Sequence, residues 1–532
     1  MVPSVIISFL FCTVLVALIS WYKTRTQRLR TSTDYFLGSR SLGFVAVGAS
    51  LFLTNISANQ FIGENESVYI NNMSVMAWGM SSVFAMLIVS EFFMPIYLRI
   101  GAVTTPDYLE ARFDKTTKRI VTLIFLAGYL VSLIPTVLYG GAVAFEGLFH
   151  VSERLGISHW AAIWILVVAI GVIGSLYSLL GGLKAITISD SVQGLGMLAG
   201  GLLLPYYGFK YLGHGSIPAG IHMVFGSQKE HLNAIGRRYD AVPFSTMFTG
   251  MLLVNLYYWG MEQFIVQEAL ASKSLAASQK GIALACVGKL ISPLLLNIPG
   301  LIAVHLYAHM DNTATVFPRL AADVLPPVAA GFIASIVFGA AIGTFNAGLN
   351  SSGTLYTMNL YKPWKDARKK EVNEGQLVKV SKQFQVLVVL LGICIAPFIA
   401  LFKGGFYTYI QMVSSFFSIP VFTVLAVGFL TRRVPALAAK VGLVFFVVVY
   451  ALSQFVFDTG IHYLHVLAIL FLMTTALMLV IGKMMPMAVP YSRERMAIVD
   501  LKPWKNRYWM NSILLILMIL LFVLFSPLGL AK

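Results

Sequence analysis

Apolar stretches long enough to cross a membrane recur along the whole chain. The sequence has 532 residues, of which 58% are hydrophobic and only 11% are charged, whereas soluble chains carry about 25% charged residues. Since about 20 apolar residues cross the roughly 30 Å hydrocarbon core of a bilayer, we expect an all-α integral membrane protein of 14 spanning helices. They are predicted at 5–22, 43–63, 74–98, 119–147, 159–180, 190–211, 244–265, 278–307, 326–357, 380–402, 406–430, 436–456, 461–482 and 510–528.

The formal net charge of +16 is concentrated in alternate loops. Lys and Arg cluster after the first, third, ninth, eleventh and thirteenth predicted helices, while the loop at 64–73 has none. Because cytoplasmic loops are enriched in Lys and Arg, the odd-numbered loops are predicted to be cytoplasmic and both termini extracytoplasmic. This placement explains the basic charge without a nucleic-acid partner.

The first apolar stretch is predicted to be a retained helix and not a signal peptide. No Lys or Arg precedes it, and the basic cluster from Lys23 to Arg30 follows it in place of a small-residue cleavage site. Every loop is too short or too similar in composition to form a separate soluble domain, so residues 1–532 are predicted to form one membrane domain.

The second apolar stretch is interrupted by polar residues at a depth where a bilayer holds no water. Residues Leu51–Gly63 read LFLTNISANQFIG. Polar, glycine-containing backbone at membrane depth is tolerated where protein encloses it or where it lines a cavity. The interruption therefore predicts a broken helix and a transport site.

Several collinear motifs resemble the sodium/solute symporter family, in its bacterial sodium/sugar branch. The resemblance runs from about residue 5 to 530. The motifs are TDYFLG at Thr33–Gly38, NISANQFIG at Asn55–Gly63, YSLLGGLKA at Tyr177–Ala185, SDSVQ at Ser189–Gln193, NLYYWG at Asn255–Gly260, Gln263, Gln267, ALASKS at Ala269–Ser274, Gln279–Gly281, Pro299–Gly300, Leu349–Ser352, Thr357–Tyr361 and Tyr409–Gln411.

The resemblance implies a fold of 14 helices with two inverted five-helix repeats, each starting with a broken helix, as in LeuT-like transporters. It divides the chain into a first helix and cytoplasmic loop (1–42), a first repeat (43–211), a second repeat (244–430) and C-terminal helices (431–532). For the second break, the sequence itself offers only Asn255 and Gly260. The location implied is the bacterial inner membrane.

For the coupling sodium ion, the resemblance implies backbone carbonyl ligands and helix hydroxyls. The carbonyl positions are Leu53, Ile56 and Ala340, and the hydroxyl pair falls on Gly343 and Thr344, of which only the threonine has a hydroxyl. The missing ligand leaves coupling to a proton, or to no ion, as an alternative. Taken alone, Thr344 could instead bond back to its own i−4 carbonyl.

Asp190 lies on the ion's cytoplasmic exit path in similar proteins. It is the only carboxylate between Glu153 and Glu230. A helix-capping role at the start of the span at 190–211 is the structural alternative, and both roles can hold together.

For the solute, the resemblance implies a hexose-like site of amides, a lysine and an aromatic gate. The positions are Gln60, Ser82, Asn255, Lys289 and Gln411, with Tyr258 as the gate beside Trp259. A sugar ring offers donors and acceptors at its rim and apolar faces, which suits this set.

One exchange of acids departs from the family pattern. The family's carboxylate position is Gly79 here, while Glu64 stands at an apolar position of the outer lid, whose other members are Trp78 and Tyr407. Glu64 is interpreted either as a solvated residue at the helix mouth or as a replacement hydrogen-bonding partner for the solute. Glu262 and Glu268 are further departures from the family.

The sequence contains no GxSxG, HExxH or P-loop motif and no cluster of His or Cys ligands, which argues against an enzyme and against an ATP-driven pump. No cofactor other than Na⁺ as coupling ion, and no obligate protein partner, is predicted. The function expected is sodium-coupled symport of a small polar solute, most simply a sugar. A membrane sensor that binds the solute without net transport is the alternative from another class.

Overall fold

The computed structural model describes residues 2–25, 31–238, 240, 242–310, 312–401, 406–457, 460–492 and 499–532. All regular elements of this part of the chain are helical. The first half contains α1 (Val2–Thr24), α2 (Ser32–Leu37), α3 (Phe44–Asn55), α4 (Ala58–Ile70), α5 (Met76–Ile88), α6 (Met94–Arg99), α7 (Thr105–Arg112), α8 (Lys115–Gly128), α9 (Ile134–Phe149), α10 (Val151–Leu155), α11 (His159–Leu212) and α12 (Ile217–Gly226). The second half contains α13 (Gly250–Gly260), α14 (Gln263–Leu270), α15 (Leu275–Leu296), α16 (Ile298–Leu306), α17 (Val316–Val324), α18 (Pro327–Tyr356), α19 (Lys362–Ala367), α20 (Glu374–Ile395), α21 (Phe406–Leu430), α22 (Ala436–Phe455), α23 (Tyr463–Met484) and α24 (Arg507–Leu524).

Among the described residues, 11 helices are long and apolar enough to cross a membrane, or 12 when the bent pair α3 and α4 counts as one span. The predicted set of 14 has two more members, at 190–211 and 244–265. The first of these is the second half of the long helix α11, and the second is divided between α13 and α14. A helix break therefore accompanies each of the two segments, at Gly182 and after Gly260.

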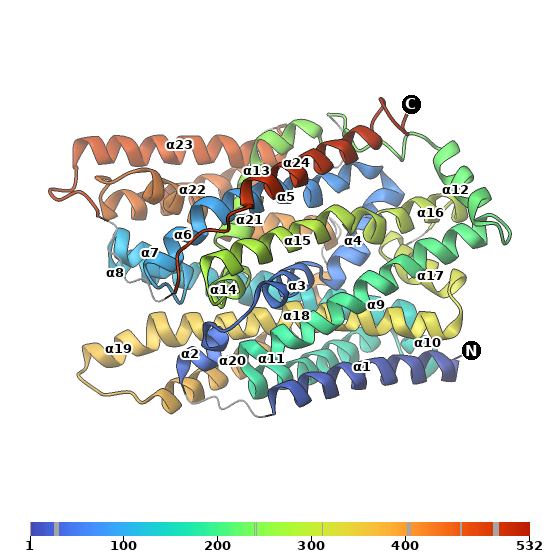
Figure 1. The fold of residues 1–532 in the computed structure, drawn as a ribbon, viewed down its shortest axis with the longest axis horizontal. Coiled ribbons are helices and arrows are strands. Elements are labelled where there is room, and N and C mark those ends of the chain that lie inside the picture. The colour runs from blue at the N-terminus through green and yellow to red at the C-terminus, as the bar shows by residue number, and fades with distance from the viewer. Residues whose placement is uncertain are drawn as a thin grey trace.

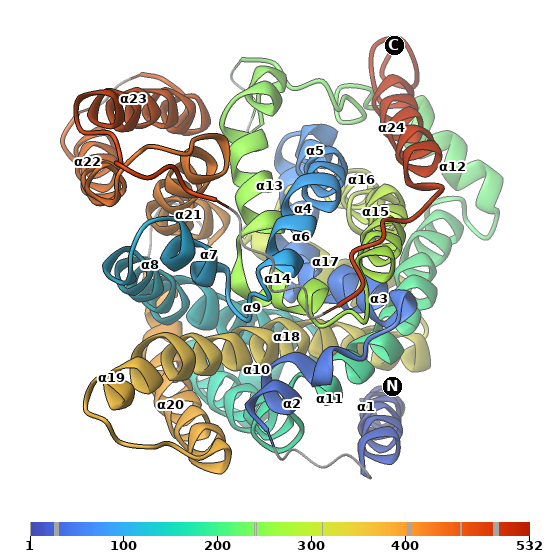
Figure 2. The same cartoon turned by 60° about the vertical axis from the view of Figure 1, so that its left-hand side comes forward.

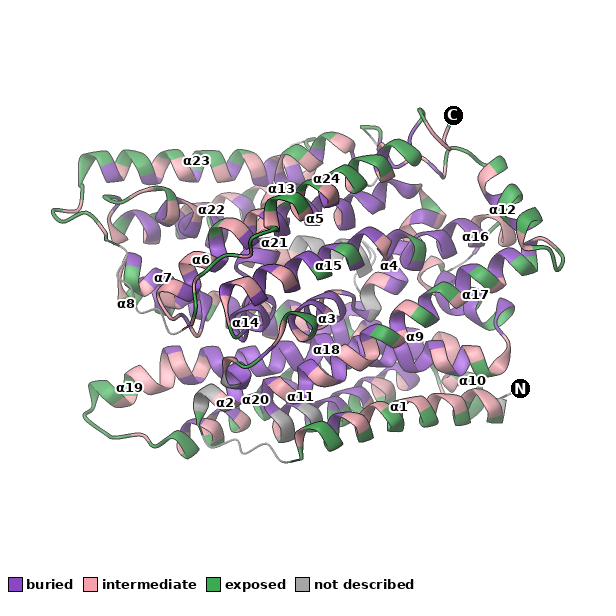
Figure 3. Ribbon diagram, viewed as in Figure 1, coloured by how far each residue is buried: buried purple, intermediate pink, exposed green. Residues whose placement is uncertain are grey.

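The helices form one elongated bundle (Figure 1). In the turned view, α4, α5, α13 and α15 lie together in the middle, and α18 passes beside them (Figure 2). The peripheral helices α1, α23 and α24 show exposed residues along their length (Figure 3), and those on α1 include Leu10, Phe11 and Leu18. Apolar side chains on the outside of such a bundle suit contact with lipid.

The two ends of the chain lie at the same end of the bundle, and α8 and α19, which adjoin basic clusters, lie at the other (Figure 1). This arrangement is the one that the charge pattern requires when both termini share a side of the membrane.

The predicted interruption of the second span appears as a sharp bend between α3 and α4. The segments Phe44–Asn55 and Gln60–Ile70 meet at 54°, and Ile56 and Ser57 between them have extended backbone. Since the last carbonyls of a helix lack the usual intrahelical partner, the end of α3 turns backbone oxygens toward other helices, and the carbonyl of Thr54 accepts from Thr344 of α18.

A second break separates α13 from α14. Gly260 ends α13, and Met261 and Glu262 leave the helical conformation before α14 begins at Gln263. A side chain on Gly260 would lie 2.8 Å from the ring of Phe93 on the neighbouring segment. Gly260 is thus both the end of a helix and a point of close packing.

The segment α11 consists of two helices that meet at a kink at Gly182, where the sequence predicts two spans. That residue has φ of +60°, a conformation that favours glycine. A Cβ atom there would also lie 2.9 Å from the carbonyl oxygen of Tyr35. The second helix begins directly after Gly182, earlier than the predicted start at 190, so Asp190 lies inside that helix and not at its start.

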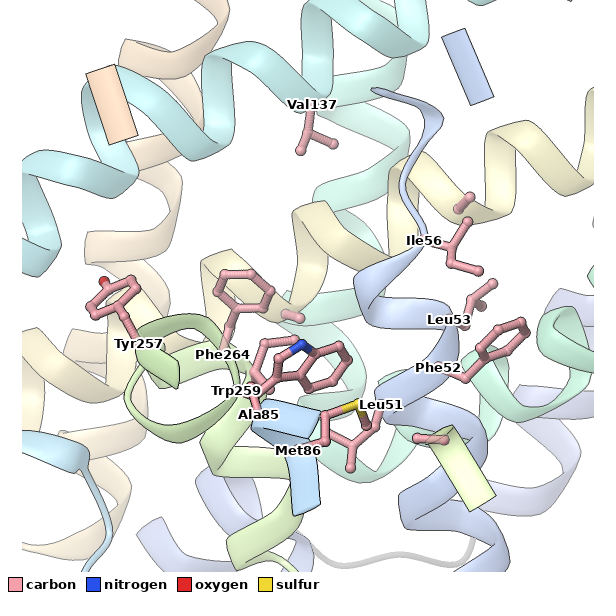
Figure 4. Packing of buried hydrophobic residues seen from close by; sticks show 14 of the residues in the cluster. Leu51, Phe52, Leu53, Ile56, Ala85, Met86, Val137, Tyr257, Trp259 and Phe264 are labelled. Atoms are coloured by element: carbon pink, nitrogen blue, oxygen red, sulfur yellow. The ribbon is translucent and has the colours of Figure 1, made fainter. Parts of the chain in front are cut away.

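The core around both breaks is apolar and closely packed. Figure 4 shows Trp259 beside Ala85, Met86 and Leu51, with Leu53 and Ile56 at the end of α3. A Cβ atom on Gly48 of α3 would lie 2.8 Å from the carbonyl oxygen of Gly281 on α15. Small residues let membrane helices approach this closely, which fixes the first broken helix against α15.

Candidate functional site

A cavity of about 260 Å³ lies between the two helix breaks. Its wall combines residues from α3, α4, α5, α13, α15, α18 and α21. The predicted site residues that line it are Gln60, Glu64, Ser82, Asn255, Tyr258, Trp259, Lys289 and Thr344. Residues separated by up to 284 positions are thus brought to one space, between Gln60 and Thr344.

The amide side chains in this wall differ in whether their hydrogen-bonding atoms already have a partner in the protein. The Nδ2 of Asn255 donates to the hydroxyl of Ser81 at 2.9 Å. The Oε1 of Gln60 is buried and accepts no hydrogen bond from the described residues. A buried amide oxygen without a donor is costly, so this atom can be satisfied by a hydroxyl or amine of a bound solute.

Ser82 contributes less than the resemblance implies. Its hydroxyl donates to the carbonyl oxygen of Gly79 on its own helix, at 2.6 Å. The oxygen lone pairs of Ser82 stay available, but its hydrogen is used within α5.

Two aromatic side chains form an apolar wall next to the amides. The ring of Tyr258 makes edge contacts with Trp259 and Phe264, with centroids 5.4 Å and 5.8 Å apart. The ammonium of Lys289 lies 6.0 Å from the centroid of Trp259. A cation close to an indole face is attracted by the ring electrons, so this contact can hold the lysine at the edge of the cavity.

Glu64 is buried in the cavity wall, with only 5% of its surface exposed. Its Oε2 accepts a hydrogen bond from Nδ2 of Asn297 at 3.0 Å. The interpretation of Glu64 as a solvated residue is therefore wrong, because α4 carries its side chain inward. Glu64 and Lys289 line the same cavity, whose wall also includes the acid Glu262.

The predicted sodium ligands gather where the end of α3 meets α18. The hydroxyl of Thr344 can donate to the carbonyl of Thr54 at 2.9 Å and to that of Ala340, its own i−4 residue, at 3.2 Å. Leu53 and Ile56 flank Thr54 at the helix end. Carbonyl and hydroxyl oxygens are the ligands that hard cations prefer, and here they converge from two helices.

Asp190 is fully inside the protein, at 1% exposure. Its Oδ2 accepts from the hydroxyls of Thr54 at 3.2 Å and Ser50 at 3.4 Å. Since it lies within α11 and bonds to α3, the helix-capping interpretation of Asp190 is wrong. The carboxylate belongs to the same neighbourhood as Thr344.

The structure does not describe the side chains of two of the predicted site residues. Residue Gln411 lies on α21, but its side chain is outside the described set, and so is that of Tyr407. Their roles stay predictions.

The structure adds cavity residues that the sequence did not single out. The hydroxyls of Tyr129 and Tyr257 donate to the two carboxylate oxygens of Glu262, at 2.6 Å and 2.7 Å. The hydroxyls of Ser132 and Ser414, which also line the cavity, are 2.9 Å apart. The only signal for these residues was polarity inside apolar stretches, which does not indicate which helix face turns inward.

Comparison with known proteins decides the family. The sequence model of the sodium:solute symporter family matches residues 35–445. The chain belongs to this family. The symporter is therefore an integral membrane transporter and not an enzyme.

Similar proteins cover most of the symporter. An uncharacterised symporter of Escherichia coli, YidK, is 41% identical over 94% of this chain and 87% of its own length. A sodium/glucose cotransporter of Vibrio parahaemolyticus is 29% identical, over 79% of each chain. The structure of a Na⁺-coupled sialic acid symporter, with 18% identity, superposes with a TM-score of 0.75 over 90% of this chain and 97% of that one. The family and the fold support sodium-coupled symport.

Proposed function

We propose that the symporter moves a neutral sugar or polyol together with sodium, by alternating access, across a bacterial inner membrane. The observation that carries the proposal is the cavity between the two helix breaks, lined by amides, hydroxyls and aromatic rings. Its volume of about 260 Å³ is near the lower end of small-molecule sites, which hold roughly 300–1,000 Å³. That size suits a monosaccharide better than a larger glycoside.

The balance of charge in the cavity supports a solute without net charge. Lys289 is matched by Glu64, and the carboxylate of Glu262 is already bonded to two tyrosine hydroxyls. The wall therefore holds one acid more than it holds bases, and both oxygens of that acid, Glu262, already accept from tyrosine hydroxyls. Gln60, Ser82, Asn255 and Gln411 are proposed to bond the rim of the solute, and Tyr258 and Trp259 to cover one face of it.

Sodium is proposed to bind beside the cavity, at the end of α3. The ligands proposed are the carbonyls of Leu53, Ile56 and Ala340 and the hydroxyl of Thr344, with Asp190 next to them. Thr344 also lines the solute cavity. A single residue in both sites offers a direct route by which occupancy of one affects the other.

The proposed transport cycle uses two inverted repeats, 43–211 and 244–430, within 14 spans. Each repeat begins with a broken helix, α3 with α4 and α13 with α14. Broken helices in corresponding positions are typical of transporters that rock one bundle against another around a fixed site. The termini are proposed to face the extracytoplasmic side, and the basic loops the cytoplasm.

The solute site can be tested by ligand-induced changes in tryptophan fluorescence, because Trp78 and Trp259 both line the cavity. The symporter is purified in a detergent solution that contains sodium. We expect its tryptophan fluorescence to change when a neutral hexose or cyclic polyol is added, and not when a sugar acid or an amino sugar is added. Gln60→Ala and Asn255→Ala should each weaken that response by about 1–3 kcal/mol of affinity. Gln383→Ala, an exposed amide on α20, is the matched control and should leave it unchanged.

Two results would contradict the solute assignment. The first is a response to charged sugars alone. The second is an equal response from the Gln60, Asn255 and Gln383 variants to every solute that binds the wild type.

A further inference from the structure

Glu262 lies in the break between α13 and α14, where its side chain turns away from the helix that follows. It precedes α14 with a non-helical backbone, at ψ of 117°, and its side chain makes no capping bond to that helix, although an acid at such a position often does. Its two oxygens accept instead from Tyr129 and Tyr257. All three residues line the solute cavity. The break therefore places a carboxylate with two phenol groups in the cavity wall.

The tyrosine rings hold these groups in a fixed geometry. Tyr257 stacks on Phe125, with ring centroids 6.3 Å apart and planes 20° from parallel. Tyr129 contacts the ring of Phe264 at a centroid distance of 6.2 Å, and its oxygen accepts from the backbone amide of Phe264 at 3.3 Å. No Lys or Arg of the described residues forms an ion pair with the buried Glu262. The carboxylate is therefore stabilised by the two hydroxyl hydrogens, and both are directed at it.

Every hydrogen of this group is already used. A tyrosine hydroxyl has one hydrogen, and an ionised carboxylate has none. Since both hydroxyls donate to Glu262, no hydrogen is left for a solute, whereas the oxygens keep lone pairs. Two bonds leave open about half of the roughly four acceptor sites of the carboxylate. Tyr129, Tyr257 and Glu262, here called the acceptor cluster, can therefore only accept hydrogen bonds from a solute.

Other hydroxyls of the wall are used in the same way, while the lysine differs. Ser82 donates to the carbonyl of Gly79 at 2.6 Å, and Thr136 donates to that of Leu133 at 3.1 Å. Lys289, which lines the same cavity, carries donors and no acceptor when it is charged. A solute oxygen that only accepts, such as a ring oxygen, is thus matched by Lys289 and not by the acceptor cluster.

We propose that the acceptor cluster is a subsite for a solute hydroxyl that donates its hydrogen, and that Glu262 is the residue that sets this requirement. The inference rests on the proposed function, because it assumes a polyhydroxylated solute in this cavity. It deepens that function by naming the chemical group that one part of the wall recognises. An analogue without a donor at this position leaves buried acceptors unsatisfied, which lowers its affinity.

The subsite is tested with solute analogues that lack one hydroxyl each. The parent probes are D-glucose, D-galactose and myo-inositol. The parent that binds most tightly is compared with its monodeoxy and monofluoro derivatives through the tryptophan fluorescence of the purified protein. Fluorine accepts weakly and cannot donate. We expect one ring position at which both derivatives bind the wild type at least about tenfold more weakly than the parent.

Two variants should change the loss at this position in opposite directions. In Glu262→Gln the amide hydrogens replace one tyrosine donor, so that a tyrosine hydrogen becomes free for the solute. The loss for the fluoro derivative should then fall below about threefold. Tyr257→Phe keeps the ring that stacks on Phe125 but releases one carboxylate oxygen, so the loss should grow by about threefold or more. Losses at the other ring positions should stay as in the wild type.

The matched control is Glu153→Gln, the same exchange at an exposed acid of α10, which should keep the wild-type pattern. The subsite is overturned when no ring position requires a donor, or when the Glu262 and Tyr257 variants weaken the parent and all derivatives by one common factor. Where Glu262→Gln does not fold, Tyr257→Phe decides alone. Failure of all three parents to bind would contradict the proposed function itself, and the subsite with it.

Discussion

The hydroxyl of Thr344 lies 2.9 Å from the backbone carbonyl of Thr54, across the contact between α18 and the end of α3. The bond ties the broken helix to α18 at the point where the proposed ion ligands converge. It also uses the only side-chain oxygen that remains of the family's hydroxyl pair. A sodium ion bound here would rest against both helices, so its binding would favour the arrangement in which they are in contact.

Thr344→Ala should therefore weaken the dependence of solute uptake on sodium binding. Loss of one neutral oxygen ligand is expected to cost about 1 kcal/mol, which raises the sodium concentration for half-maximal uptake by roughly fivefold. Thr344→Ser keeps the hydroxyl and should stay close to the wild type. Uptake is measured over a range of sodium concentrations, and identical sodium dependence of the two variants would show that the ion lies elsewhere.

Tyr258 is predicted to act in the gate of the cavity. Tyr258→Ala removes the ring that contacts Trp259 and Phe264, so the uptake rate should fall by about tenfold. Equilibrium binding of the solute in detergent should change less than the rate. Tyr258→Phe keeps both ring contacts and should retain uptake. An alanine variant that transports normally but binds the solute poorly would show that Tyr258 only covers the solute and does not act as a gate.

Positions 64 and 79 can be tested together, because the carboxylate that the family has at position 79 is missing here and an acid stands at position 64. The buried Glu64 carboxylate is oriented by Asn297, and Glu64→Met should abolish uptake because it removes an acceptor beside Lys289. A Cβ atom at position 79 would lie 3.2 Å from the hydroxyl of Ser292, so a side chain there requires a small shift of that hydroxyl. Adding Gly79→Glu to Glu64→Met should recover part of the uptake, or shift preference toward hexoses.

The control for this pair is Glu153→Gln, an exposed acid in the short helix α10, which should transport normally. Solute competition assays compare the single and double variants. Near-normal uptake by Glu64→Met would remove Glu64 from the site.

Asp114 is predicted to stabilise the fold at neutral pH through two separable contacts. It caps α8 by accepting from the backbone of Thr117 at 2.7 Å, and Lys440 of α22 donates to it at 2.6 Å. Partial burial opposes ionisation, but the hydrogen bonds from Lys440 and Thr117 outweigh it and lower the pKa of Asp114. Stability from this group is therefore present above the ordinary pKa of about 3.9 and lost as pH falls below it.

Two variants separate these contacts in thermal unfolding. Asp114→Ala loses the cap and the ion pair and should cost about 1 kcal/mol. Asp114→Asn keeps a capping side chain and loses only the partly exposed pair, so it should cost less, about 0.2–1 kcal/mol. The difference between wild type and Asp114→Asn should shrink steadily as the pH falls below about 4. A constant difference down to pH 3 would contradict the assigned ionisation.

The sequence predicted the elements whose cause is local. The interruption at 51–63 is visible because polar residues follow one another in an apolar span, and the bend between α3 and α4 lies there. The break after Gly260 was only hinted at, since Met261 and Glu262 leave the helix without a run of polar residues. In α11 the sequence predicted two spans, and the two helices there meet at the kink at Gly182, but the second one starts earlier than the predicted residue 190.

The site was less predictable because its contacts join distant helices. The resemblance supplied positions such as Lys289 and Thr344, but the bonds from Thr54 to Asp190 and Glu268 link α3, α11 and α14. Sequence spacing within a helix shows which residues share a face, and it does not show which helix lies opposite. The role of Thr54 therefore needed the structure.

Sodium-driven uptake is the central claim, and one measurement tests it most directly. The symporter is reconstituted into proteoliposomes, and accumulation of a labelled hexose or cyclic polyol is compared under an inward sodium gradient, an inward proton gradient and no gradient. We expect accumulation above equilibrium with the sodium gradient alone, and its loss on addition of a sodium ionophore. Accumulation driven by protons, or equal uptake under all three conditions, would contradict the account.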